Sequence, residues 1–168
     1  MKKRLLIAAA VIFIGTSIVT GQNVIPDWYA SVNRFTLLVS GYEDVSKTFG
    51  RPAKAIGERK YSEYIESPEG RFHVSYETGK CVENHGNRIG WKVPEWTVIE
   101  LSFIPRKPIE PRQLPFELNG FRSYPISDVP GAFVYENDDV GISYDLNRKR
   151  KVEVISFYPP TSMKHLHC

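Results

Sequence analysis

Cysteine and methionine are scarce in this sequence, with two residues of each among 168. Neither Cys81 nor Cys168 directly follows the apolar stretch near the N-terminus, where a bacterial lipoprotein needs the cysteine that carries its lipid. The sequence therefore argues against lipid anchoring. Long helices are not expected either, because 12 prolines and 12 glycines suit many short elements joined by turns.

Without its first few residues, the chain has no excess of positive or negative charge. The whole chain has 22 Lys and Arg against 19 Asp and Glu, a net charge of +3. Three of the basic residues are Lys2, Lys3 and Arg4, so the rest of the chain is neutral, with 19 basic and 19 acidic residues. This balance gives no support to nucleic-acid binding, which depends on clustered positive charge.

The N-terminus has the pattern of an export signal. A basic start is followed by a run over residues 5–19 that is apolar except for three small residues, and Val19-Thr20-Gly21 suits a signal peptidase. A helix that spans a membrane needs roughly 20 apolar residues, more than this run holds. We therefore predict a signal segment over residues 1–21 and a mature protein that is periplasmic or secreted. The alternative is an uncleaved N-terminal anchor, which would then be the chain's contact with the membrane.

Two cysteines in an exported chain predict one disulfide, here between Cys81 and Cys168. Because Cys168 is the last residue of the sequence, this bond would tie the C-terminal tail to the body. The alternative is two unpaired thiols. The tail also holds His165 and His167, but no fourth ligand is evident and an oxidised cysteine does not bind a metal, so no metal site and no cofactor are predicted.

Alternating apolar residues predict several antiparallel strands. Residues 71–76 place Phe72, Val74 and Tyr76 on one face, and residues 97–104 do the same with Ile99, Leu101 and Phe103. By the same pattern, further strands are expected over residues 60–67, 131–136, 140–146 and 151–158. Val140, Ile142 and Tyr144 are expected to share one face.

Helices are predicted to be few and short. A first helix is expected within residues 26–34, and at most a weak one within residues 113–119. Ser40 and Glu43 form a capping-box pattern, which predicts a helix that buries Val45 and Phe49 and ends at Gly50 and Pro52. Strands with few helices indicate an α+β fold.

The two halves of the body resemble each other. Residues 74–77 match residues 142–145, and residues 98–105 match residues 152–159, with offsets of about 68 and 54 positions. We interpret this as two tandem small modules, each a helix or helical turn packed on an antiparallel sheet. The first covers residues 22–108 and contains an insertion at residues 79–96, and the second covers residues 109–168. The alternative is a coincidence between two amphipathic hairpins.

Two stretches of sequence carry family resemblances. Residues 38–45, followed by Phe49-Gly50-Arg51-Pro52, resemble the helix signature of SmpA/OmlA-type modules, found in a small lipoprotein of the outer-membrane assembly machine; the same architecture occurs in tandem in the β-lactamase inhibitor protein. Residues 90–94, 141–144 and 165–168 are similar to a group of small exported bacterial proteins. These resemblances imply the fold and the compartment, and they carry over no catalytic residue. Unlike the assembly lipoprotein, this chain has two expected modules and lacks the lipid-bearing cysteine.

The insertion is the best candidate for a binding site, because long loops in compact domains are often functional. It contains Trp91 and Trp96, and tryptophan is enriched at interface hot spots. We predict a contact surface made by Trp91 and Trp96 with Arg88 and Lys92. The alternative is that both tryptophans cover the core.

No nucleophile, base and orienting group form a recognisable set, so we expect the protein not to be an enzyme. The first expectation is a binding or scaffold protein of the bacterial cell envelope, whose partner is another envelope protein. The second is a secreted inhibitor of another enzyme, and the third is a small hydrolase. The basic run Arg148–Lys151 is interpreted as a solvated hairpin tip, with contact to an anionic surface or acidic partner as the alternative.

Overall fold

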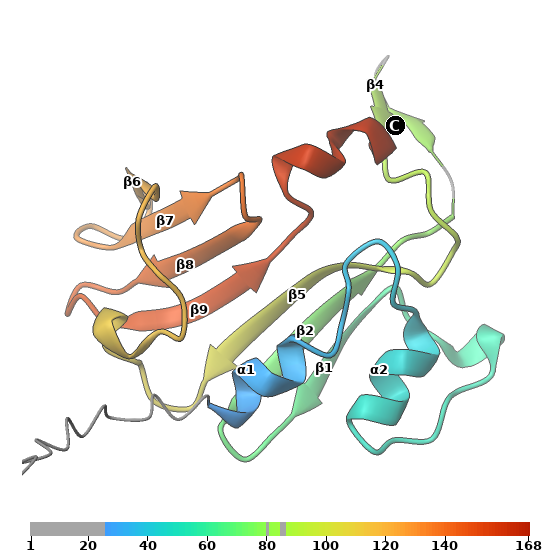
Figure 1. The fold of residues 1–168 in the computed structure, drawn as a ribbon, viewed down its shortest axis with the longest axis horizontal. Helices are drawn as coiled ribbons and strands as arrows, with labels where there is room; N and C mark the ends of the chain where they lie inside the picture. Colours follow the sequence, from blue (N-terminus) through green and yellow to red (C-terminus); the bar gives the residue numbers. More distant parts are fainter. Residues whose placement is uncertain (1–25, 80, 85–86) are drawn as a thin grey trace, which may run out of the picture.

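The computed structural model of the chain describes residues 26–79, 81–84 and 87–168, and the predicted signal segment lies outside them. The main feature is a seven-stranded antiparallel sheet with the order β1-β2-β5-β9-β8-β7-β6 (Figure 1). Its strands are β1 (Ser62–Glu66), β2 (Gly70–Tyr76), β5 (Val98–Pro105), β6 (Arg122–Pro125), β7 (Phe133–Asn137), β8 (Ile142–Leu146) and β9 (Val152–Phe157). A separate hairpin pairs β3 (Val82–Asn84) with β4 (Asn87–Ile89).

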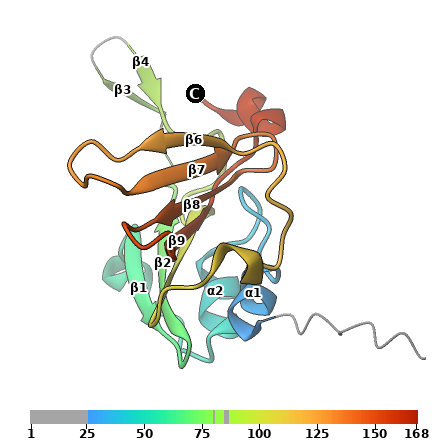
Figure 2. The ribbon, with the colours of Figure 1, turned by 90° about the vertical axis from the view of Figure 1, so that its left-hand side faces the viewer.

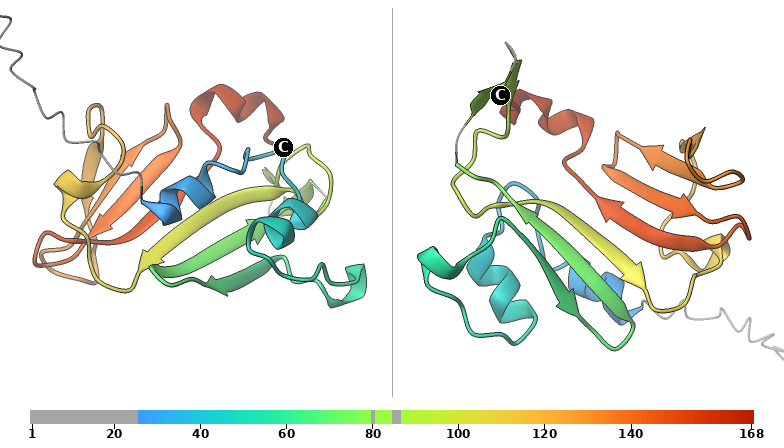
Figure 3. Two further views of the ribbon diagram at one scale, coloured as in Figure 1. Left: turned by 60° about the horizontal axis from the view of Figure 1, so that its bottom comes forward. Right: turned by 180° about the vertical axis from the view of Figure 1, so that it is seen from behind.

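The helical elements are short, and two of them, with the segment at residues 109–121, cover one face of the sheet. α1 (Asp27–Val32) and α2 (Tyr42–Thr48) lie in front of β1, β2 and β5 in Figure 1, and residues 109–121 cover the second half on the same side. Seen from behind in Figure 3, no helix of the described chain lies over the sheet. Three 3-10 turns complete the fold: η1 (Ile56–Glu58), η2 (Pro111–Gln113) and η3 (Thr161–Leu166). The α+β class is therefore confirmed.

The core lies between this helical layer and the sheet. The alternation in β2 buries Phe72, Val74 and Tyr76 as predicted, each at most 2% exposed. Trp28 of α1 stacks on Phe103 with ring centroids 4.7 Å apart. Burial of several large aromatic side chains on one side of the sheet supplies the main driving force for folding, since each removes 150 Å² or more of surface from water.

The second helix is confirmed, but its predicted cap is wrong by one residue. Gly41 is the N-cap of α2, and its backbone N–H donates to the Asp44 carboxylate at 2.8 Å. Ser40 instead accepts the backbone N–H of Thr36 at 2.9 Å, so its hydroxyl is used by the preceding turn. Glu43 faces outward and forms an ion pair with Arg59.

Two predicted strand faces also need correction. A β-bulge opposite Ser75 and Tyr76 shifts the register of β5, so Val98 is fully buried and Ile99 is only partly buried. A bulge adds one residue to a strand and moves the following side chains to the other face. Val140 lies in the β7–β8 turn, before β8 begins, and is 55% exposed.

The second half was also incompletely predicted. The sequence pattern missed β6, an edge strand that ends in Pro125. Residues 109–168 contain 3-10 turns and no α-helix, and the weak helix expected at residues 113–119 is absent from this described segment.

Strands from both halves join one continuous sheet, with β5 and β9 adjacent at its centre. Ser102 pairs with Ser156, and the two hydroxyl oxygens lie 2.8 Å apart. Phe72 pairs with Phe103 in the first half, and Ile142 pairs with Phe157 in the second half. Because Phe103 matches Phe157 in the predicted repeat, Ile142 corresponds to Phe72. The expected match of Ile142 with Val74 is therefore two residues out of register. The two outer parts of the sheet run across each other in Figure 2, as the twist of successive strands accumulates.

Candidate functional site

The insertion and the C-terminal tail lie side by side. The disulfide joins Cys81 to Cys168, whose Cα atoms are 5.6 Å apart, which confirms the predicted pairing. Trp91 and His167 form an isolated β-bridge, and the backbone N–H of Lys92 donates to the carbonyl of Leu166 at 2.7 Å. A covalent bond and backbone hydrogen bonds therefore hold the tail against the insertion.

A cavity of about 450 Å³ opens beside this junction. It is lined by residues of the insertion, of the β7–β8 turn and of the segment after β9: Trp91, Asp138, Tyr158, Pro159, Thr161, Lys164 and His167. The indole of Trp91 meets the His167 ring edge to face, with centroids 5.1 Å apart. Aromatic walls with a few polar groups are typical of a binding pocket.

Two of the polar side chains of this cavity, Tyr158 and Asp138, already have partners. The Tyr158 hydroxyl donates to Asp138 Oδ1 at 3.0 Å, and the same carboxylate forms an ion pair with Arg122. Burial, together with the hydrogen bond to Asp138, raises the pKa of the Tyr158 phenol above its ordinary value, so the phenol remains a neutral donor. The phenol and the carboxylate on this wall are therefore held in place by each other and by Arg122.

Glu77 holds the insertion in place, and the sequence analysis did not single it out. Its side chain is 2% exposed, and its carboxylate accepts the backbone N–H of Trp91 at 2.7 Å and that of Thr78 at 2.8 Å. Its carbonyl accepts the N–H of Trp96 at 2.9 Å. Glu77 is thus bonded to both Trp91 and Trp96. An acidic residue directly after an alternating apolar strand was the only signal in the sequence.

The two predicted contact tryptophans have different neighbours. Trp96 stacks on Tyr61 with centroids 4.3 Å apart and meets Tyr42 edge to face, so it covers the core of the first half. Trp91 lies apart from this cluster, at the tail, and Lys92 beside it is exposed. Arg88 lies in β4, where its backbone pairs with Glu83, and its side chain is outside the described part.

The face of the sheet opposite the helices forms a second candidate surface, which we call the open face. One row of residues crosses all seven strands in register on this face: Tyr64, His73, Ser102, Ser156, Ser143, Glu136 and Arg122. These residues alternate with core residues along their strands, so their side chains point away from the helices. The middle of the row is lined by small serines, and its two ends carry larger side chains.

Neither a metal centre nor a membrane span is found in the described residues. No group of three or more His, Cys, Asp or Glu side chains gathers there in an arrangement that would hold a metal ion. Cys168 is bonded to Cys81 and is no longer a thiol ligand. None of the helices over residues 26–79, 81–84 and 87–168 is long and apolar enough to cross a membrane.

Comparisons with known proteins leave the family open. No family model matches this chain, and no curated protein matches it. Among solved structures, it is similar to the crystal structure of a DUF4309 family protein, YjgB, from Bacillus subtilis, with 13% sequence identity and a TM-score of 0.48. That similarity covers 74% of this chain and 81% of the other chain. The resemblances to SmpA/OmlA-type modules and to the β-lactamase inhibitor protein therefore stay predictions.

Proposed function

We propose that the chain is an exported, non-enzymatic binding protein of the bacterial cell envelope, which holds a partner protein against the open face. The observation that carries this proposal is the one-sided covering of the sheet. α1, α2 and residues 109–121 pack on one face, while the open face has no helix over it in the described part of the chain (Figure 3).

The ends of the row have the composition of an interface. Tyr64 is 58% exposed, stacks on His73 at 4.7 Å between centroids, and lies under the Arg71 guanidinium at 4.6 Å. At the other end, Tyr124 of β6 is 42% exposed. Tyrosine and arginine are enriched among interface hot spots. Between them, Ser156 and Ser143 are partly exposed, and their small side chains allow a protruding segment of a partner to approach the strands, while Ser102 is 5% exposed.

The size of the open face fits a protein partner. Six strand spacings of about 4.8 Å give a width of about 29 Å from β1 to β6. A standard interface buries roughly 800 Å² on each partner, which a surface of this width accommodates. We include the Trp91 cavity in the same contact.

The compartment in this proposal rests on the covalent chemistry of the chain. A disulfide persists in an oxidising compartment, and the Cys81–Cys168 bond supports a location outside the cytoplasm. Together with the sequence pattern of residues 1–21, it supports export. N-terminal sequencing of the mature protein, combined with cell fractionation, tests this part. Full-length protein recovered from the cytoplasm would refute it.

We also propose that the sheet arose by tandem duplication. The proposal is supported by the strand register, because β2 pairs with β5 on one side of the Ser102–Ser156 pair as β8 pairs with β9 on the other side. Both halves carry a bulge at the corresponding point, between Ser75 and Tyr76 and between Asp145 and Leu146. An experimental structure in which the two bulges fall at different positions relative to this central pair would contradict the duplication.

Site-specific photo-crosslinking in envelope extracts tests partner binding. A crosslinker placed at Tyr64, Ser143 or Tyr124 should capture the same protein, because all three positions lie on the open face. At Lys47 of α2, on the helical side, it should not. An enzyme that loses activity when captured would make the protein an inhibitor, and a retained envelope component would make it a scaffold. Equal capture from Lys47 would refute the open face as the contact surface.

A further inference from the structure

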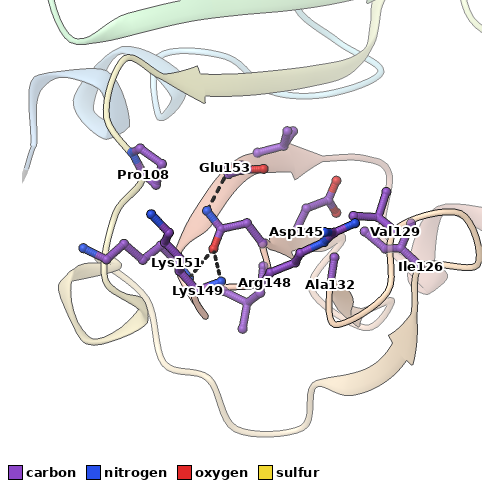
Figure 4. A pocket seen from close by; sticks show the side chains of 12 residues that line it. Pro108, Ile126, Val129, Ala132, Asp145, Arg148, Lys149, Lys151 and Glu153 are labelled. Atoms are coloured by element: carbon purple, nitrogen blue, oxygen red, sulfur yellow. Dashed lines mark hydrogen bonds between the residues drawn. The ribbon is translucent and has the colours of Figure 1, made fainter.

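A second and larger cavity lies at the far end of the second half, away from the Trp91 junction. Its volume is about 690 Å³, within the range of small-ligand sites. Figure 4 shows it between the β6–β7 loop, which contributes Ile126, Val129 and Ala132, and the β8–β9 turn. A cavity of this size is not needed for the binding of a partner protein on the open face.

Inside the cavity, an acidic group lacks a counter-charge. Asp145 of β8 is partly buried, and it forms no ion pair or side-chain hydrogen bond with any described residue. Burial, and secondly the negative charge of Glu153, raises the pKa of the Asp145 carboxyl above its ordinary value. Both carboxyl groups line the same cavity (Figure 4). A cation bound between them would relieve the cost of burial and their mutual repulsion.

The rim of the cavity carries positive charges that lack an anionic partner among the described residues. Arg148 and Lys149 are exposed and line the cavity, and neither forms an ion pair within the described chain. Lys151 differs, because it pairs with Glu110 at 3.1 Å. Two unpaired cations on one rim offer a place for a carboxylate or a phosphate.

The turn that carries these cations is fixed rather than free. The Asn147 side-chain oxygen accepts the backbone N–H groups of Lys149 at 2.9 Å and Lys151 at 3.1 Å. Its amide nitrogen donates to Glu153 Oε1 at 2.8 Å, and Figure 4 shows these three bonds. The guanidinium of Arg150 lies 4.7 Å from the centroid of the Phe133 ring. A held turn presents its charges at a fixed place, which lowers the entropy cost of binding.

We propose that this cavity binds a small zwitterion, whose ammonium group contacts Asp145 and Glu153 and whose carboxylate or phosphate contacts Arg148 and Lys149. An anion alone would meet the two carboxylates inside, and a cation alone would meet the basic rim. The apolar side chains of Ile126, Val129 and Ala132 would contact the carbon chain between the two charges. Amino acids, short peptides and amino-phosphate headgroups share this chemistry.

Calorimetric titration of the mature protein tests the charge requirement. The zwitterionic probes are Nα-acetyl-lysine and O-phosphoethanolamine, and the single-charge probes are ethanolamine and inorganic phosphate. We expect at least one zwitterion to bind at least tenfold more tightly than both single-charge probes. A preference for Nα-acetyl-lysine would indicate an amino-acid or peptide source, and a preference for O-phosphoethanolamine a headgroup source. Phosphate or ethanolamine binding as tightly as both zwitterions, or no saturable binding at millimolar concentrations, would overturn the proposal.

Variants locate the site. Asp145→Asn should weaken zwitterion binding at least tenfold without weakening phosphate binding, and the double variant Arg148→Ala/Lys149→Ala should weaken both. Asp139→Asn and Lys47→Ala are matched controls at exposed positions outside the cavity, and they should leave binding unchanged. Amide chemical shifts should move in residues 126–132 and 145–154. Unchanged zwitterion affinity in either test variant would overturn the proposal. Because none of the seven residues in the open-face row and neither tyrosine used for crosslinking is altered, failure here leaves the photo-crosslinking result intact.

Discussion

Loss of the disulfide should strongly destabilise the protein. The Cys81–Cys168 bond closes a loop with a sequence separation of 87 residues. For a loop of this length, the chain-entropy relation gives about 4.5 kcal/mol of stabilisation through the unfolded state. For a domain of this size, each kcal/mol corresponds to about 2–4 °C, so the Cys81→Ser/Cys168→Ser variant should melt roughly 9–18 °C below the oxidised protein.

Two measurements check this expectation. Thermal and urea unfolding give the loss of stability, and reducing agent should lower the melting temperature of the native sequence while leaving the double variant unchanged. Hydrogen exchange reports the local effect, because the Lys92 N–H bonded to the Leu166 carbonyl should lose protection when the tail frays. A loss of stability below about 1 kcal/mol would refute the reasoning, since the unfolded chain would then gain little freedom from the broken bond.

The remaining predictions concern single side chains. Glu77→Ala should cost about 2 kcal/mol in urea unfolding, because it removes a buried carboxylate that accepts the part-buried backbone N–H groups of Trp91 and Thr78; Glu58→Ala at an exposed position is the control, and equal losses would contradict this role. Trp91→Ala should weaken partner capture by about 2 kcal/mol, roughly 30-fold, and cost less than that in stability because the indole is only partly buried; a large loss of stability with unchanged capture would make Trp91 a core residue. Asp145→Asn should raise the melting temperature at pH 7 and have little effect at pH 3. The pKa of Asp145 is raised in the folded protein, so as pH rises the unfolded chain loses this proton first, from about pH 3.8. The free energy of unfolding therefore decreases as pH rises from that value through the pKa of the folded state. Thermal melts at the two pH values measure the difference, and an equal effect at both would show that the charge of Asp145 is not responsible.

Local patterns predicted the elements of the first half better than those of the second half, where β6 was missed. The alternation of β2 and the spacing of Trp28 and Val32 in α1 follow from one hydrophobic face per element, and both are visible in a short window of sequence. Periodicity did not predict the bulge beside Val98, because a bulge depends on the partner strand and leaves no regular signature. The cap of α2 was misassigned because Ser40 had a competing use in the turn at Thr36.

The candidate sites were harder to predict than the elements, because they depend on pairings between distant parts of the chain. Trp91 and His167 were each noted in the sequence, but only the disulfide suggested that the tail returns to the insertion. Trp96 was grouped with Trp91 on sequence proximity, whereas its partner Tyr61 lies before β1. The row on the open face can be predicted only when the strand order is known. Sequence patterns indicate which face of the sheet a side chain occupies, but they do not indicate which strands are neighbours.

The bond between Cys81 and the final residue makes the last half of the chain a covalent ring, which contains every strand from β3 to β9. A protease that cuts one exposed peptide bond in this ring, such as one in the loop at residues 127–131, produces no separate fragment. Both pieces stay joined through the cystine, and the Trp91 junction keeps its two sides together. Nicked protein should therefore run as one species on a non-reducing gel and as two after reduction.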